Sequence, residues 1–434
     1  MIDSGKETSA VKSRRRWRLL LFLFFAAGFV WGGWAWWRDR RYKSAMAEIE
    51  AEIVAGRFGT ASRELVKLLV WKPDTDGGLA YLLGNCELAR RRDQEAEEAW
   101  ARVVPGSAYS DRAILARMRL LEDHGRLADA EQLVRDAAEN LRNEGKALLV
   151  SLVPIYNQQG RIEEAQRLIE TRWEQENEKG EGASERAIQL VRLHIELTLK
   201  PIPVEAVRAF LDHAARLAPQ DDRIWLGRAN LAIRTGAYDE AERWLDACQG
   251  RRPDDVPVWL ARLNWGIATN RIDVVQQALM RLPAAESIPS QIHRLKAWLA
   301  VNRGDLATER RELERLSAID PADLTTLDRL AQLAKKDGQP ARAAAFLVQK
   351  AEIDQLRSRY ETLHQRNQPI RNAVELARLA EQLGRVFEAR VFLTLEISED
   401  PNREDLRHDL ERLSPRPITV PARGRTLADL LAVG

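Results

Sequence analysis

Side chains that could ligate a metal or activate a nucleophile are scattered along this chain. Six histidines are present, and no two of them have ligand spacing on one helix face: His124, His194, His213, His293, His364 and His408. The sequence contains no zinc-protease HExxH motif, no phosphate-binding P-loop, no dinucleotide fingerprint and no nucleophile elbow. We therefore predict no catalytic residue, no metal site, no cofactor and no small-molecule substrate.

Two other groups of reactive side chains also have an ordinary structural interpretation. Acidic pairs such as Glu97-Glu98 and Glu163-Glu164 could supply an acid and a base, but neighbouring positions on a helix point in different directions. Such pairs are typical of a solvated helix face. Cys86 and Cys248 belong to no CxxC pair, so we expect two small buried side chains and no disulfide framework.

The composition indicates that helices position all of these residues. Ala, Leu, Arg and Glu dominate, the charged fraction is 30% and the aromatic fraction is 6%. These abundant residues lose little rotamer freedom in a helix. Alternation with a period of two, which would predict strands, is scarce. The first expectation is therefore an all-α chain.

A six-residue phrase recurs along the sequence: glycine, any residue, a hydrophobic residue, two variable residues and alanine. Clear copies begin at Gly56, Gly125, Gly160, Gly236 and Gly384, and weaker copies begin at Arg91, Asn270, Gly304 and Gly338. From Gly236 to Asn270, Gly304 and Gly338 the step is 34 residues each time. We expect the first residue to adopt a left-handed turn that ends one helix, and the alanine to lie where two antiparallel helices approach closely.

The phrase and its period resemble the tetratricopeptide repeat, which has a length of 34 residues and W, L-G, A and P signature positions. The best copy has Trp225, Ala229 and Ala232 in its first helix and Ala241, Leu245 and Pro253 in its second. Arg228 stands where leucine is usual, and Val275 and Glu309 replace the second-helix alanine. The resemblance implies a right-handed α-solenoid of helix-turn-helix repeats. Because a solenoid repeat contacts only its neighbours, Cys86 and Cys248 would lie too far apart to pair.

The repeat frame divides the chain into segments. About ten repeats are expected over residues 42–401, starting near residues 42, 77, 111, 146, 184, 222, 256, 290, 324 and 370. The period is interrupted by a charged stretch at Trp173–Ser184, by a turn at Lys200–Pro203 and by about 12 extra residues, Gln355–Gln368, that lengthen a helix. Residues 402–413 are expected to form a polar capping helix. Residues 414–434 contain Pro415, Pro417 and Pro421 and are expected to be extended.

The resemblance also places a binding surface, because the first helices of tetratricopeptide arrays line a concave face that holds partner peptides or proteins. Asn can bind a peptide backbone there, and Arg can bind a carboxylate through two hydrogen bonds. Asn230 and Asn264 are one period apart and are expected to stack along the groove. The predicted groove residues are Tyr81, Asn85, Arg119, Arg223, Asn230, Arg234, Asn264, Arg294, Trp298, Lys335, Arg371 and Arg378.

Residues 19–37 form an uncharged apolar run that predicts a single transmembrane helix after a basic tail over residues 1–18. A helix of this length spans about 28 Å. Trp17 lies at one edge of the run and Trp31, Trp34, Trp36 and Trp37 crowd the other, as at a membrane boundary. The run ends in bulky indoles without a small-residue cleavage site, which favours an anchor over a cleaved signal peptide. Residues 1–44 carry ten Lys and Arg against three acids, so the basic excess flanks the run and does not indicate nucleic-acid binding.

Together these features predict a membrane-anchored scaffold that binds partner proteins on its repeat surface. The positive-inside rule favours a cytoplasmic N-terminus, which would place the repeats in the periplasm of a bacterial inner membrane. A regulatory or chaperone-like subunit of an envelope assembly, secretion or cytochrome-maturation complex remains open as an alternative. A self-assembling structural protein and an enzyme are further alternatives.

Overall fold

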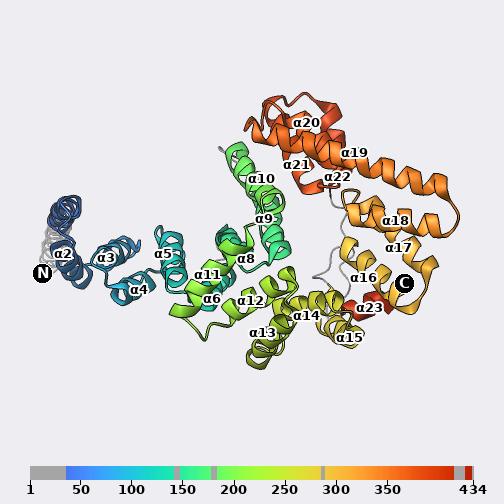
Figure 1. Ribbon diagram of the computed structural model, residues 1–434. Helices are drawn as coiled ribbons and strands as arrows, with labels where there is room; N and C mark the ends of the chain where they lie inside the picture. The colour runs from blue at the N-terminus through green and yellow to red at the C-terminus, as the bar shows by residue number, and fades with distance from the viewer. Residues whose placement is uncertain (1–35, 141–146, 177–182, 285–288, 415–425, 433–434) are drawn as a thin grey trace, which may run out of the picture. The chain divides into compact units, whose positions relative to one another are not determined.

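The computed structural model describes residues 36–140, 147–176, 183–284, 289–414 and 426–432. Within these ranges the regular elements are helices, and the one isolated β-bridge joins Pro283 to Thr426. The chain divides into two compact units, Met1–Leu120 and Leu121–Gly434 (Figure 1). The all-helical prediction is confirmed.

The first unit packs antiparallel helices around a small apolar core. Ile49, Leu65 and Leu79 are among its fully buried side chains. Its helices are one over residues 36–54, α2 (Phe58–Trp71), α3 (Gly78–Ala89) and α4 (Asp93–Ala101), and α5 (Ser110–Asp123) runs across the boundary between the units.

The second unit continues the same construction over a longer stretch. Successive helices pair as α12 with α13, α14 with α15, α16 with α17, α18 with α19 and α20 with α21. The described helices of this unit are α6 (Leu127–Asn140), η1 (Leu149–Leu152), α8 (Val153–Gln158), α9 (Ile162–Glu176), α10 (Ala183–Leu199), α11 (Val204–Leu217), α12 (Asp222–Thr235), α13 (Tyr238–Arg251), α14 (Val256–Ala268), α15 (Ile272–Arg281), α16 (Pro289–Arg303), α17 (Leu306–Ile319), α18 (Leu324–Lys336), α19 (Pro340–Gln365), α20 (Ala373–Gln382), α21 (Val386–Glu399), α22 (Glu404–Leu413) and α23 (Leu427–Ala432).

The recurring phrase forms the turn inside each helix pair. Every phrase position has a positive φ, including the two non-glycine copies Arg91 (59°) and Asn270 (56°). This left-handed conformation ends the first helix, and the second helix begins within two or three residues. The predicted turn geometry is confirmed at all nine positions, which are Gly56, Arg91, Gly125, Gly160, Gly236, Asn270, Gly304, Gly338 and Gly384.

The sixth position of the phrase lies in the contact between paired helices. Ala61, Ala130 and Ala241 are fully buried there, as expected for a close approach. Glu309 occupies the same position in a degenerate copy and is also buried, but its carboxylate accepts hydrogen bonds from Arg329 at 2.6 and 3.2 Å. The ion pair with Arg329 compensates the negative charge of Glu309, which would otherwise be costly to bury.

Two of the predicted interruptions of the period are visible as helix geometry. Lys200–Pro203 form a non-helical turn between α10 and α11. Of the extra residues, 355–365 extend α19, which is 26 residues long, and 366–368 follow its end. Part of the third interruption, residues 177–182, lies outside the described residues.

The second unit departs from the expectation that each repeat contacts only its neighbours in sequence. α10 packs directly against α21, and α6 contacts α12. Trp173 of α9 also meets the ring of Phe387 edge-on, with 5.7 Å between ring centroids. Charged and aromatic side chains from helices distant in sequence are thus buried against one another at the contact of α9 and α10 with α21.

The C-terminal region also differs from its prediction. α22 lies within the segment expected to cap the array, and it buries only Leu406. Residues 414–434 were expected to be extended, but Leu427–Ala432 form α23, which packs against α15. The helix forms because Leu, Ala and Asp suit a helical turn and an apolar surface is available to cover its leucines. Residues 415–425 lie outside the described residues.

The predicted basic tail and almost all of the predicted transmembrane run lie outside the described residues. In the portion of the chain that is described, no helix combines the length and the apolar character needed to cross a bilayer. Trp36 and Trp37, the last two residues of the predicted run, begin the helix over residues 36–54 and are exposed. The guanidinium groups of Arg40 and Arg41 lie over their rings, each 5.3 Å from a ring centroid.

Candidate protein-binding groove

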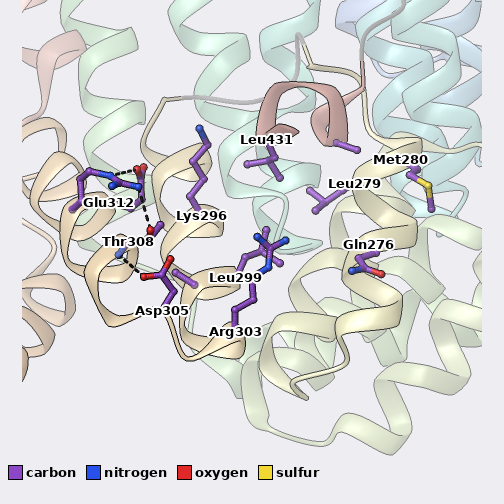
Figure 2. Close-up of a pocket in the computed structure, with 13 residues that line it drawn as sticks. Gln276, Leu279, Met280, Lys296, Leu299, Arg303, Asp305, Thr308, Glu312 and Leu431 are labelled. Atoms are coloured by element: carbon purple, nitrogen blue, oxygen red, sulfur yellow. Dashed lines mark hydrogen bonds and ion pairs between the residues drawn. The ribbon is translucent and has the colours of Figure 1, made fainter. Parts of the chain in front are cut away.

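A cleft of about 550 Å³ opens between α15, α16 and α17, and α23 forms one of its walls (Figure 2). We call this cleft the α15–α17 groove. It is lined by Gln276, Leu279, Met280, Lys296, Leu299, Ala300, Arg303, Asp305, Thr308, Arg311 and Glu312, together with Ala428 and Leu431 of α23.

The apolar part of the groove comes from α15 and α16. Leu279 is buried, whereas the neighbouring Met280 is 58% exposed. Leu431 of α23 extends toward Leu279, as Figure 2 shows. Methionine is flexible and polarizable and adapts to varied apolar partners, so an exposed Met280 suits a binding surface.

α23 is held against this surface by both backbone and side-chain contacts. The Leu427 amide donates to the carbonyl of Leu282 at 2.9 Å, and the Leu427 side chain is 3% exposed. Leu430 and Leu431 pack against the same apolar cluster, whose members include Leu279, Leu282, Leu295 and Trp298. The apolar face of α23 is thus buried, while Asp429 remains exposed.

The sequence around Thr426 explains why so short a helix forms. The Thr426 amide and hydroxyl both donate to the Asp429 carboxylate, at 2.8 and 3.0 Å. The Asp429 amide donates in return to the Thr426 hydroxyl at 3.4 Å. These reciprocal hydrogen bonds resemble a capping box, in which side chains accept hydrogen bonds from the amides that the first helical turn leaves unpaired.

The charged rim of the groove has a positive excess. Glu312 is buried and already compensated, because its carboxylate contacts His293 Nδ1 at 2.7 Å and accepts from Arg315 at 3.0 Å. Burial alone would raise the pKa of Glu312, but His293 and Arg315 outweigh it and lower that pKa. In the described part of the chain, Lys296 and Arg303 have no carboxylate within ion-pair distance. These two cations can meet an acidic ligand.

The predicted groove residues of the first unit are Tyr81, Asn85 and Arg119. The Tyr81 ring packs against Tyr109 at 5.4 Å, and the Tyr81 carbonyl accepts from the Trp100 indole. Asn85 is half-buried in α3, and Arg119 is exposed on α5.

Three predicted residues on α12 make polar contacts within the chain, and among them Arg223 is buried, Asn230 is half-buried and Arg234 is exposed. Arg223 is 5% exposed and forms ion pairs with Glu131, at 2.8 Å, and with Asp255. Asn230 donates to the Gln159 carbonyl at 2.9 Å, and Arg234 donates to the carbonyl of Ile202 at 3.0 Å. Arg223 is therefore buried at the contact between α12 and α6, where Glu131 of α6 pairs with it.

The remaining predicted residues lie on open surface or beside the groove. Asn264 and Arg294 are exposed, and Arg294 contacts Asp323 at 3.3 Å. Trp298 packs against the cluster that holds α23. Three further cations are exposed on or before later first helices: Lys335, Arg371 and Arg378. None of the predicted residues lines the α15–α17 groove, and Trp298 lies nearest to it, in the apolar cluster against which α23 packs.

The sequence-based mapping missed the groove because it considered only first helices. Gln276, Leu279 and Met280 belong to the second helix α15, and the occupant comes from the C-terminal region. A usable signal was present in Thr426–Ala432, where leucines recur at helical spacing and Asp429 follows Thr426 by three residues. Pro417 and Pro421 lie just before this stretch, and prolines favour an extended chain.

The structure also places the side chains that could ligate a metal or act as nucleophiles. Within it, no group of three or more His, Cys, Asp or Glu side chains could hold a metal ion. Both cysteines are buried and free, and burial raises the pKa of Cys86 to about 11 and of Cys248 to about 12. Thiols with such pKa values are poor nucleophiles at neutral pH.

Comparison with known proteins identifies one segment of the array. No curated protein sequence matches the chain. Similar solved structures include the APC/C hetero-tetramer Cut9-Hcn1 (12% identity, 85% of this chain and 82% of that chain covered, TM-score 0.32). Yeast Tom70 is also similar (12% identity, 86% and 96% covered, TM-score 0.26). The family model described as tetratricopeptide repeat matches residues 204–263, which span α11, α12, α13 and the start of α14. Residues 204–263 are therefore similar to the tetratricopeptide repeat, and they lie within a longer series of helix pairs.

Proposed function

We propose that this protein is a scaffold that binds partner proteins, and that the α15–α17 groove captures an amphipathic helix of the partner. The observation that carries this proposal is the position of α23, a short helix whose leucines lie on the apolar wall of the groove. A surface that accepts one helix through leucine contacts has the shape and chemistry to accept another. Helix-in-groove capture is a common mode of peptide recognition.

The energetics of such capture favour a partner helix longer than α23. Burying one leucine contributes about 1.5–3 kcal/mol, and several such contacts together support micromolar affinity, about 8 kcal/mol. α23 has six residues and covers Leu279, whereas Met280 and the cations Lys296 and Arg303 stay accessible. A helix of three or more turns would reach all of them. We therefore propose a partner with leucines on one face and acidic residues at one end.

The binding test uses a synthetic helical peptide of about 18 residues, labelled with fluorescein, with leucines at i, i+3 and i+4 spacing and glutamates near its C-terminus. We expect the fluorescence anisotropy to rise with protein concentration. Met280→Glu and Arg303→Glu should each weaken binding by about tenfold or more, the first by placing a charge on the apolar wall and the second by reversing the rim charge.

Val348→Glu provides the matched control, because Val348 is 59% exposed on α19, outside the groove. That variant should bind the peptide like the wild type. Equal affinities for the wild type and both groove variants would remove the groove from the proposal. Circular dichroism of each variant separates lost binding from lost folding.

We further propose that residues 19–37 tether this scaffold to a membrane, with the repeats on the periplasmic side of a bacterial inner membrane. The uncharged run and its tryptophans support the tether. The exposed Trp36 and Trp37, each close to an arginine, have the amphipathic character of a membrane boundary. The charge excess before the run supports the orientation.

Protease protection on intact spheroplasts tests the tether and its orientation together. A C-terminal tag on the full chain should sediment with membranes after carbonate washing and be removed by external protease. A tag that washes off contradicts the tether. A tag that sediments but survives until the membrane is dissolved contradicts only the orientation.

A further inference from the structure

We infer that α23 is an internal ligand of this protein: it occupies part of the α15–α17 groove and must leave, or be displaced, when a partner helix binds. This inference rests on the proposed function of the groove. It adds a regulatory element that the proposed function does not require, since a groove could bind peptides beside a permanently fixed α23.

The contacts of α23 resemble those of a bound peptide. Its apolar face, with Leu427, Leu430 and Leu431, packs against a cluster formed by α14, α15 and α16. The Leu427 amide donates a backbone hydrogen bond to Leu282, and the bridge between Pro283 and Thr426 lies beside it. Leucine anchors on one face are typical of helices bound in grooves.

The size of α23 makes it a weak occupant. Six residues span about 9 Å, and isolated helices shorter than about 12 residues are marginally stable in water. The structure compensates with the Thr426–Asp429 cap and with the connection to α22 in the same chain. A short connection gives a tethered ligand a millimolar effective concentration, so even a weak internal helix competes measurably with a partner.

The groove also extends beyond α23 in a direction that a competitor could use. The cleft borders Ala428 and Leu431 of α23 and continues along Met280 and Arg303 (Figure 2). A partner helix could first contact this open part and then replace α23 on Leu279. The expected occupant is thus an amphipathic helix with the leucine spacing of α23 and with acidic residues near Lys296 and Arg303.

The first measurement is hydrogen exchange of residues 426–432 in the full-length wild-type protein. We expect the Leu427 amide to be protected by its bond to Leu282. Adding a saturating amount of the labelled leucine-glutamate peptide should remove that protection. Persistent protection of Leu427 at saturating peptide would overturn the inference and leave the proposed function intact.

The second measurement compares peptide affinity with and without a docked α23. Leu427→Asp should release α23, because it places a charge in a position that is 3% exposed, and should increase peptide affinity by about tenfold. Asp429→Ala, which only removes the cap, should give a smaller increase. Leu347→Asp on α19, where the leucine is 44% exposed, is the control and should leave the affinity unchanged.

The affinity measurements distinguish the proposed function of the groove from the inference that α23 is an internal ligand. Peptide binding that is equal in the wild type and in Leu427→Asp supports the proposed function and contradicts the internal ligand. Absence of binding in both, with folding intact, contradicts both. Loss of Leu427 protection on dilution, together with dimers in light scattering, would assign α23 to a second copy of the chain and overturn the arrangement within one chain.

Discussion

His194 Nδ1 lies 3.1 Å from the Glu388 carboxylate, although 194 positions separate the two residues in the sequence. The contact is buried and belongs to the surface on which α10 meets α21. Tyr360 of α19 donates to the same carboxylate, and Glu170 of α9 lies 3.5 Å from the other nitrogen of His194. Side chains from four helices, α9, α10, α19 and α21, thus meet at the His194–Glu388 pair.

This contact predicts a loss of stability as the pH rises above 6.5. Burial tends to lower the pKa of His194, but Glu170 and Glu388 outweigh it, and the pKa is raised above its ordinary value of 6.5. A raised pKa means that the stabilisation is fully present below pH 6.5 and is lost as the pH rises through the folded-state pKa. The melting temperature of the wild type should fall above pH 6.5 more steeply than that of His194→Asn.

Glu388 determines how the same contact responds to low pH. Burial would raise its pKa, but His194, Arg385 and Tyr360 lower it below the ordinary value of 4.5. Its stabilisation is present above pH 4.5 and is lost as the pH falls through the folded-state pKa. Parallel pH profiles for the wild type and His194→Asn, measured by calorimetry, would contradict a role for the contact.

Glu131 is the centre of a second buried ion network. Its carboxylate contacts Arg161 at 2.8 Å and Arg223 at 2.8 Å, and all three side chains are at most 6% exposed. Burial would raise the pKa of Glu131, but Arg161, Arg223 and Arg135 lower it strongly. Glu131→Gln should destabilise the protein by about 3–5 kcal/mol, because it leaves two buried cations without their shared anion.

Chemical denaturation measures this effect, with Glu139→Gln on the same helix as the control. Glu139 is exposed, so its substitution should change the free energy of unfolding by less than about 0.5 kcal/mol. Equal effects of the two substitutions would show that the network adds little to stability.

Asn230 and Asn264 lie one repeat period apart, but their substitution should have different effects on stability. Asn230→Ala removes a hydrogen bond to the buried Gln159 and should cost about 1 kcal/mol. Asn264 is exposed, and Asn264→Ala should leave the unfolding free energy unchanged within about 0.5 kcal/mol. A thermal melt of each variant checks both, and a loss at Asn264 equal to that at Asn230 would contradict the structural assignment.

Two glycines in the first unit predict opposite responses to the same substitution. A methyl group at Gly84 would overlap the Trp100 indole, so Gly84→Ala should destabilise by about 1–3 kcal/mol. At Gly59 a methyl group would meet only Arg90 Nε at 3.7 Å, an ordinary contact, and Gly59→Ala should stabilise α2 by about 0.5–1 kcal/mol. Calorimetry of both variants measures the signs, and the same sign for both would contradict the packing described for Gly84.

The sequence by itself determined the local construction of this protein. A left-handed residue is required wherever two helices are joined by so short a turn, and an alanine is required where they touch, so both leave a periodic record at positions such as Gly236 and Ala241. These requirements act over a few residues. Helix type, turn positions and the long α19 could therefore be predicted from the sequence.

Only the tertiary structure decided which surfaces remain open. Arg223 has the position of a groove residue in the repeat frame, yet it is buried because α6, which no periodicity relates to it, supplies Glu131. Likewise Leu427 follows a proline-containing stretch that suggests an extended chain, and it becomes helical because α15 and Trp298 provide a surface for its apolar face. Whether two segments this distant in sequence come into contact depends on the angles between all the helix pairs that separate them. Those angles produce no sequence pattern at the residues that make the contact.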